Sequence, residues 1–234
     1  MESPESASEV VAAKALGKRF GRRWALAHVD LVVRPGEAVL LAGANGSGKT
    51  TLLRLIAGLG QPTTGSLRIF GRDPGEERLG CRRRLSLVSH ENYLYPPLTA
   101  LETLRLWARL AGLALGDEEL VRLLAEVELA DRRDHRVGGF SAGMRKRLTL
   151  LRTRLEEPGL ILLDEPLSAL DAAGRTLVER WIGGFVAAGR TVIMASHAVE
   201  RMSRVAHRGV LLDRGQVAWS GPAGEIPGRL EGHR

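Results

Sequence analysis

The sequence predicts an α/β fold in which a mostly parallel sheet carries a helical insertion. Residues 38–42, 160–163 and 192–195 form short, continuous apolar runs, which are typical of strands buried on both faces. A glycine-rich stretch at 43–50 joins the first run to a segment with apolar residues at helical spacing. Between about 99 and 154 the pattern is helical throughout, which predicts a helical subdomain.

The first strand and helix are expected on either side of the glycine-rich stretch. The run Ala38–Ala42 is bounded by glycine, as a buried strand often is. The segment from Lys49 carries leucine or isoleucine at positions 52, 53, 55 and 56 and then reaches Gly58, a typical helix stop.

The helical insertion is predicted to contain three helices. Thr99-Ala100-Leu101-Glu102 is a capping box that opens a helix through Leu110. A second helix is expected near Glu118–Val127. A third is expected after Ser141, where leucines occur at positions 148, 150, 151 and 155.

The C-terminal region predicts a hairpin followed by an irregular tail. Val210–Leu212 and Gln216–Trp219 flank Asp213-Arg214-Gly215, which is a turn signal. The expected domain limits are a flexible tail at 1–8, one domain at 9–221 and a C-terminal tail at 222–234. Within the domain, the core is expected at 9–90 and 157–221 and the helical subdomain at about 91–156.

Composition disfavours several classes of protein. The chain carries a net charge of +7, but its arginines are scattered and aromatic residues make up only 4%, so we expect no nucleic-acid partner. Arg82-Arg83-Arg84 is interpreted as solvated surface, or alternatively as a site of attraction to anionic lipid. No apolar run approaches the about 18–20 residues that span a bilayer, so we expect no direct membrane span and no secretory leader. Cys81 is the only cysteine and is expected to be an idle thiol.

The glycine-rich stretch Gly43–Thr50 matches G-x-x-x-x-G-K-T between a predicted strand and a predicted helix, the context of a P-loop. Its backbone N–H groups and the helix N-terminus would face phosphate oxygens. Lys49 would add a charge at the β- and γ-phosphates, and Thr50 would offer its hydroxyl to Mg²⁺. The expected nucleotide contacts are Gly43, Asn45, Gly46, Ser47, Gly48, Lys49, Thr50 and Thr51.

Two carboxylates follow the apolar run at 160–163. Asp164 would stand at the carboxyl edge of the sheet beside the P-loop, where it would hold Mg²⁺ through water. Glu165 would orient or deprotonate the attacking water. The sequence therefore predicts a P-loop NTPase that uses ATP and Mg²⁺.

With these segments, Phe140-Ser141-Ala142-Gly143-Met144 and Ser196-His197 complete a resemblance to the ABC (ATP-binding cassette) ATPase subunits, which extends from about residue 9 to 220. The resemblance implies a RecA-like, mostly parallel sheet with a helical subdomain and an N-terminal antiparallel β portion. Phe140–Met144 stands where that family has its LSGGQ signature, although Met144 replaces the glutamine.

The resemblance also implies how the site is shared. Ser141, Ala142 and Gly143 would contact ATP held by a second copy, so that two chains close head to tail as a homodimer. Ser168-Ala169-Leu170-Asp171 resembles the D-loop of the family, and Asp171 would lie at that interface. His197 resembles the switch histidine and would be catalytic with Glu165 and Lys49. Phe20 falls where the family stacks an aromatic ring on adenine.

A more specific resemblance involves Ser89-His90-Glu91-Asn92 and the following Leu98–Glu102. His90 stands where the family has the glutamine that contacts Mg²⁺, and an imidazole is a poorer Mg²⁺ ligand than an amide oxygen. The stretch resembles the ATPase of the haem exporter used in cytochrome c maturation (the CcmA family). It implies haem export, with transmembrane subunits docked near residues 85–110 and the chain peripheral on the cytoplasmic face of the plasma membrane.

Three alternatives stay open at this point. The chain could serve another ABC exporter, for a drug or a lipid, whose glutamine has drifted to histidine. It could be a soluble ABC ATPase that acts on nucleic acid or ribosomes, but such proteins usually have two cassettes or a long coiled-coil insertion. It could bind ATP without turnover, which the presence of Lys49, Asp164, Glu165 and His197 disfavours.

Overall fold

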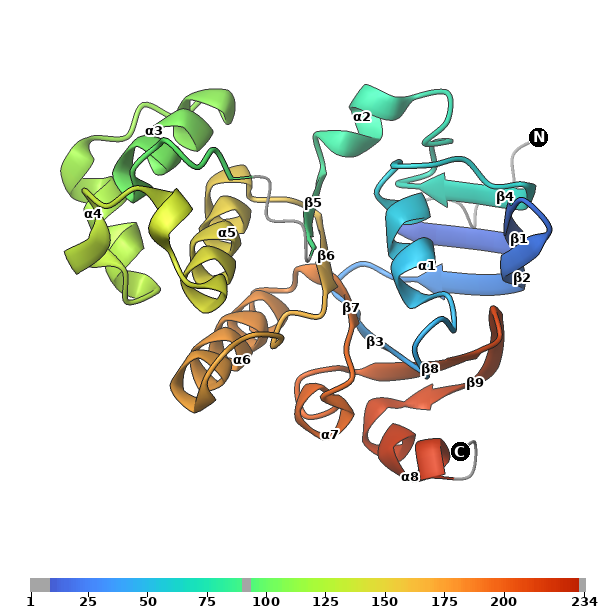
Figure 1. Cartoon of the computed structure of the whole chain (residues 1–234). Coiled ribbons are helices and arrows are strands. Elements are labelled where there is room, and N and C mark those ends of the chain that lie inside the picture. Colours follow the sequence, from blue (N-terminus) through green and yellow to red (C-terminus); the bar gives the residue numbers. More distant parts are fainter. Residues whose placement is uncertain (1–8, 90–93, 232–234) are drawn as a thin grey trace.

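The computed structural model describes residues 9–89 and 94–231, and Figure 1 shows how their elements are arranged. A six-stranded sheet has the order β5-β6-β7-β3-β8-β9. All neighbours in it are parallel except β8 and β9. Its strands are β3 (Ala38–Ala42), β5 (Leu85–Val88), β6 (Leu160–Asp164), β7 (Thr191–Ala195), β8 (Arg208–Asp213) and β9 (Gln216–Pro222).

The strand order of the large sheet brings the chemical motifs to one edge. β3 comes first in the chain but lies in the middle of the sheet, between β7 and β8. β6 lies on the other side of β7, so the segments that follow β3, β6 and β7 emerge together at the carboxyl edge. In open α/β sheets this edge is where ligands bind.

The predicted N-terminal antiparallel portion is a separate three-stranded sheet with the order β2-β1-β4. β1 (Val11–Phe20) pairs with β2 (Arg23–Val33) and with β4 (Thr64–Ile69), both antiparallel. The amide of Ala27 on β2 donates to the carbonyl of Gly215 in the β8–β9 turn, at 2.8 Å. The amide of Gly215 donates to the carbonyl of Ser47, at 3.0 Å, so the C-terminal hairpin joins the small sheet to the P-loop.

The helices surround the large sheet and form the insertion. Figure 1 shows α3 and α4 on one side of the molecule and the three-stranded sheet on the other, with the large sheet between them. The α-helices are α1 (Lys49–Ile56), α2 (Arg78–Arg82), α3 (Ala100–Leu110), α4 (Asp117–Glu126), α5 (Ala142–Glu156), α6 (Ala172–Ala187), α7 (Val199–Met202) and α8 (Ile226–Glu231). Short 3-10 turns occur at Ala130–Arg132, Val137–Gly139 and Ala223–Glu225.

The helical subdomain follows local rules that the sequence displays. The Thr99 hydroxyl accepts from the amide of Glu102 at 3.1 Å, and the Glu102 carboxylate accepts from the amide of Thr99 at 2.8 Å, so the predicted capping box is confirmed. Arg105 on α3 donates two bonds to Asp117 on α4, at 2.8 and 2.7 Å. Leucines of α3, α4 and α5, with Phe140, form the apolar core of the subdomain.

The segment after Pro222 differs from the irregular tail that the sequence predicts. A 3-10 turn leads into α8, whose first residue, Ile226, is fully buried. A Cβ on Gly209 of β8 would stand 2.7 Å from Cδ1 of Ile226, so the helix packs closely on the sheet. α8 is too short to show a periodic pattern, and it contains proline and glycine, which explains why the sequence did not predict it.

None of the helices in the described part of the chain is both long enough and apolar enough to cross a membrane.

Candidate nucleotide site

The P-loop depends on glycine at both of its ends. Gly43 follows β3 with a φ of 138°, and Gly48 precedes α1 with a φ of 109°, conformations that other residues rarely adopt. A Cβ on Gly43 would lie 2.1 Å from the carbonyl oxygen of Leu212. A Cβ on Gly48 would lie 2.6 Å from the carbonyl oxygen of Ala25. The loop is therefore fixed both by its backbone and by β8 and β2 behind it.

Lys49 stands at the start of α1 and is only 7% exposed. Its ammonium donates to the carbonyls of Gly43, at 2.7 Å, and Ala44, at 3.0 Å, so the side chain spans the loop. Burial lowers the pKa of Lys49, and the nearby carboxylates of Glu165 and Asp164 oppose that shift. The site thus holds a partly desolvated cation within the P-loop.

Thr50 and Asp164 form a pair of oxygen donors. The Thr50 hydroxyl donates to Oδ1 of Asp164 at 3.2 Å, although the two residues are 114 positions apart. Asp164 ends β6 and is 8% exposed. No group of three or more His, Cys, Asp or Glu side chains that could hold a metal exists within 9–89 and 94–231. A hydroxyl and one carboxylate fit Mg²⁺, which in nucleotide enzymes takes its other ligands from phosphate and water.

Glu165 has an unusual backbone conformation next to the P-loop. Its φ is 51°, in the left-handed region that favours glycine. The amide of His197 donates to Oε2 of Glu165 at 3.3 Å, and Nε2 of His197 lies 3.5 Å from Oε1. Oε1 and the hydroxyl of Ser47 are both buried and have no hydrogen-bond partner in the described part of the chain. Buried polar atoms of this kind are usually paired, so the two atoms favour a polar ligand at this site.

A cleft of about 480 Å³ joins these groups, which is a typical size for a small-molecule site. Phe20 stands at this cleft and is 61% exposed, so it is not a core aromatic. The cleft is lined by Phe20, Arg23, Ala25, Asn45, Gly46, Ser47, Gly48, Lys49, Thr50, Thr51, Glu165 and His197.

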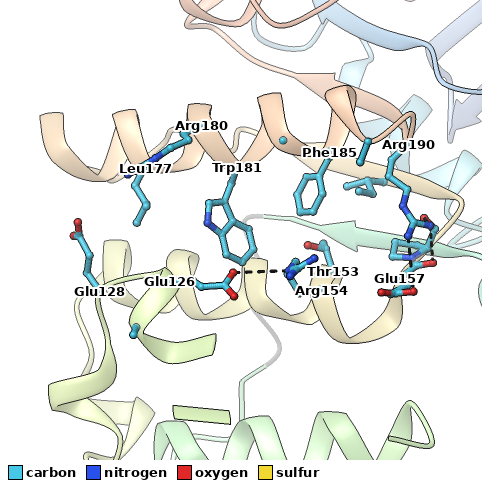
Figure 2. A pocket seen from close by; sticks show the side chains of 15 residues that line it. Glu126, Glu128, Thr153, Arg154, Glu157, Leu177, Arg180, Trp181, Phe185 and Arg190 are labelled. Atoms are coloured by element: carbon cyan, nitrogen blue, oxygen red, sulfur yellow. Dashed lines mark hydrogen bonds and ion pairs between the residues drawn. The ribbon is translucent and has the colours of Figure 1, made fainter. Parts of the chain in front are cut away.

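A larger cleft of about 690 Å³ lies elsewhere, between α6 and the helices α4 and α5. Figure 2 shows Trp181 and Phe185 pointing from α6 toward α5. Charged side chains at this cleft already pair with each other, as Arg154 does with Glu126 at 3.8 Å. The larger cleft has no glycine-rich loop, so the smaller one is the candidate nucleotide site.

Comparison with known proteins agrees with this geometry. The family model described as "ABC transporter" matches residues 26–168. The chain belongs to this family. The Nod factor export ATP-binding protein I of Cupriavidus metallidurans is 32% identical over 211 residues, 89% of this chain and 70% of that protein. In Cupriavidus pinatubonensis the protein of the same name is 33% identical, over 85% of this chain and 62% of its own length.

Solved structures of ABC cassettes are also similar. The ATP-binding cassette MJ0796, solved as a dimer in a post-hydrolysis state with ADP and Pi, superposes with a TM-score of 0.82 at 27% identity. The alignment covers 91% of this chain and 98% of the cassette. The chain is therefore an ABC ATPase with a P-loop NTPase fold, as the sequence predicted.

Five of the expected ATP contacts do not line the cleft of this ABC ATPase: Gly43, which begins the P-loop, and four residues on other elements. Ser141 is the N-cap of α5, and Ser141 and Ala142 are exposed. A Cβ on Gly143 would stand 3.1 Å from the carbonyl oxygen of Ala169, so the signature packs on the D-loop. Asp171 caps α6 by accepting from the amide of Gly174 at 2.8 Å. The structure brings the P-loop, Asp164, Glu165, His197 and Phe20 together, and it leaves Ser141, Ala142, Gly143 and Asp171 on other elements.

Two departures from the family pattern have different outcomes. Met144 is half-buried and packs against the apolar core of the helical subdomain, so its thioether replaces polar with apolar contacts. His90, which the sequence assigned to Mg²⁺, lies at 90–93, outside the described residues.

Sequence reasoning missed two residues. Arg23 of β2 lines the cleft beside the glycine-rich loop. Lys146 of α5 is buried next to Glu165. Positions 146, 149, 150 and 153 are all buried and recur at helical spacing, so a lysine on this face was a signal in the sequence.

Proposed function

We propose that this ABC ATPase is the ATP-hydrolysing subunit of a bacterial exporter, in which two copies close head to tail around two ATP molecules. One observation carries the proposal. The cleft holds a phosphate loop and a poised carboxylate, whereas the helix start of the signature, on the same chain, faces elsewhere. Each copy then supplies half of two sites. The dimeric state of the similar cassette MJ0796 supports this arrangement.

The P-loop half of the site would bind the triphosphate. Amides of the loop and of the α1 N-terminus would donate to phosphate oxygens, and Lys49 would add its charge to the β- and γ-phosphates. Phe20 would stack on adenine at the mouth of the cleft. Thr50 would hold Mg²⁺ directly and Asp164 would hold it through water, and the ion would neutralise phosphate charge.

Glu165 would act as the general base. Its carboxylate would accept a proton from water as the water oxygen forms a bond to the γ-phosphorus and the bond to the bridging oxygen of ADP breaks. His197 holds that carboxylate through its backbone amide. Its ring lies 3.5 Å from the other carboxylate oxygen and would contact the γ-phosphate.

The signature half would stabilise the same phosphate from the partner chain. Ser141 opens α5, a helix of 15 residues, so its hydroxyl and the positive end of the helix dipole are presented together. Gly143 would allow close approach to phosphate, and Asp171 would lie at the interface in the D-loop. Phosphate would thus draw the two chains together only while ATP is whole.

Export requires partners that this chain would meet through its surface. We infer docking of transmembrane subunits near residues 85–110, on the cytoplasmic face of the plasma membrane. Tyr95 and Leu110 are large apolar residues exposed in that segment, and Leu113 and Leu79 are exposed in neighbouring segments, which supports a protein contact there.

The cargo is proposed only at a coarser level. The relatives named above are Nod factor export proteins, which supports an export role and not haem in particular. Haem export stays a prediction that depends on His90. Loading membranes that hold the assembled exporter with haem, or with a Nod factor, and measuring which one stimulates ATP turnover would separate the two cargoes.

The test of the dimer uses Glu165→Gln, which keeps the shape of the side chain but removes the base. With ATP and Mg²⁺ the variant is expected to bind nucleotide, to lose at least about 100-fold in turnover and to elute as a dimer. With ADP it is expected to elute as a monomer.

The matched control is Glu118→Gln, an exposed carboxylate on α4 far from the cleft. It is expected to turn over ATP at the wild-type rate and not to accumulate as a dimer. A Glu165→Gln chain that binds ATP at saturation and remains monomeric at every protein concentration contradicts the proposal.

A further inference from the structure

Lys146 is buried in α5, one and a half turns after Ser141. Its side chain is 2% exposed, and its ammonium donates to the carbonyl oxygen of Glu165 at 3.1 Å. The chain has four lysines, and among those only Lys49 and Lys146 are buried. Both stand beside Asp164 and Glu165. Burial lowers the pKa of Lys146 while those two carboxylates oppose the shift, so this lysine occupies a costly position.

The carbonyl that Lys146 contacts belongs to the most constrained residue of the site. A left-handed backbone costs a residue other than glycine about 1–2 kcal/mol, so Glu165 needs contacts that hold it. Its amide donates to Ala195 at 2.9 Å. Its carbonyl accepts from the Ser168 amide at 3.1 Å, from the Ser168 hydroxyl at 2.8 Å and from Lys146. Of these donors, only Lys146 comes from α5.

Helix α5 also carries the signature, which lies at its N-terminus. Lys146 lies five positions after Ser141, which is about 7.5 Å along a rigid helix axis. A shift of the first turn of α5 must therefore move the donor at Glu165, because a helix of 15 residues transmits displacement along its length. The hydrogen bond from Lys146 joins two functional groups that the proposed function places in different ATP sites.

We infer that Lys146 is a positioning residue that couples the two ATP sites of the dimer. It would connect the signature, which contacts ATP bound by the partner, to the main chain of the Glu165 that serves the chain's own ATP. The inference rests on the proposed head-to-tail dimer. Phosphate at the signature stabilises the position of α5 in which Lys146 holds Glu165, so each site becomes competent when the other is filled.

The experiment compares Lys146→Met with the wild-type chain. Methionine has nearly the same length but removes the donor together with its charge. Removing one member of a buried charged group can destabilise a fold, so stability is measured beside activity. The purified chain is assayed for kcat, KM and the Hill coefficient for MgATP, for nucleotide affinity at low protein concentration, and for its thermal unfolding midpoint.

Lys146→Met is expected to lower kcat by about tenfold, which corresponds to about 1.4 kcal/mol. The Hill coefficient is expected to fall toward 1, whereas the nucleotide affinity of the monomer stays within about twofold. A residue that only supports the fold would lower the unfolding midpoint without changing the Hill coefficient.

Arg147→Met is the matched control on the same helix. Arg147 donates to the carbonyl of Val127 and pairs with Glu128 at 2.9 Å, inside the helical subdomain. This variant is expected to leave kcat and the Hill coefficient unchanged. Lys146→Leu is a second apolar variant, and it gives the same readouts if the methionine variant does not fold.

The double variant Lys146→Met with Glu165→Gln separates this inference from the proposed function. Dimers with ATP are expected for the double variant as for Glu165→Gln alone. If Glu165→Gln does not dimerise, the proposed function fails. If Glu165→Gln dimerises but the Lys146 variants keep the wild-type kcat and Hill coefficient, the coupling role of Lys146 is overturned and the dimer stands.

Discussion

Helices α1 and α5 are both proposed to present an N-terminus to phosphate, but only α5 caps its own first turn with a side chain. The N-cap of α1 is Gly48, which has no side chain to accept from the helix. The N-cap of α5 is Ser141, whose hydroxyl accepts from the amide of Met144 at 3.1 Å. Uncapped amides at a helix start need a partner. The α1 start thus has no side-chain cap of its own, whereas the α5 start has one of its amides capped while the chain is alone.

The difference also appears in burial. Lys49 begins α1 within the cleft, whereas Ser141 and Ala142 stand exposed. We therefore expect the α1 start to bind phosphate in a single chain, and the α5 start to add its contact only in the proposed dimer. Binding ATP and closing the dimer can then be separate steps with separate free energies.

The largest effect is expected from Gly48→Ala, which attacks the α1 start. The new Cβ would meet Ala25 at 2.6 Å while φ is 109°, so we expect at least about 2 kcal/mol loss in the free energy of unfolding, together with loss of ATP binding. Denaturant unfolding and nucleotide titration measure both. Gly189→Ala is the matched control, since its φ is 72° and its Cβ would have open space, and it should cost only about 1 kcal/mol.

The second largest effect is expected from Lys49→Ala. Removing the charge at the phosphates should weaken ATP binding by at least about tenfold, or about 1.4 kcal/mol, with little effect on the unfolding midpoint. Isothermal titration measures the change. Lys14→Ala, an exposed lysine of β1, should bind ATP as the wild type does, and retained affinity in Lys49→Ala would refute the phosphate role.

Ser141→Ala tests the α5 start. Loss of the cap should cost about 1 kcal/mol of stability and lower turnover, while the affinity of the monomer for ATP stays unchanged. Ser141→Asp refines the test, because aspartate caps a helix well but places a negative charge where phosphate is proposed to bind. We expect stability to return and turnover to remain at or below that of Ser141→Ala, and recovery of wild-type turnover in Ser141→Asp would contradict a phosphate contact.

Phe20→Ala should have the smallest effect. The ring is exposed and contacts little of the core, so stability should change by less than about 0.5 kcal/mol. Loss of stacking should weaken ATP binding severalfold but leave triphosphate binding unchanged, because inorganic triphosphate has no base. A competition assay with both ligands detects the difference.

The parts of the site that the sequence predicted are those made by neighbouring residues. Local backbone geometry determines the P-loop, the capping box at Thr99 and the β8–β9 hairpin. Their residue types are therefore enough to predict them. The parallel strands β3, β6 and β7 were predicted because each is a short apolar run, whereas β5, in which Ser86 interrupts the apolar residues, was not. Lys146 was missed because its partner is a backbone carbonyl 19 positions away, and a backbone group leaves no pattern in the sequence. Helix α8 was missed because only its packing on the large sheet, through Ile226, shows that the segment is ordered.

The β8–β9 turn at Gly215 connects segments that are far apart in the sequence. Its carbonyl accepts a hydrogen bond from Ala27 of β2, and its amide donates one to the carbonyl of Ser47. The β8–β9 hairpin therefore supports the P-loop, which lies far from it in the sequence. A fragment that ended before residue 208 would retain every recognisable nucleotide motif but would lose β8 and β9, which pack behind the P-loop. We expect such a fragment to express as an aggregate that added ATP does not rescue, because the P-loop would lack its contacts with β8 and with the β8–β9 turn.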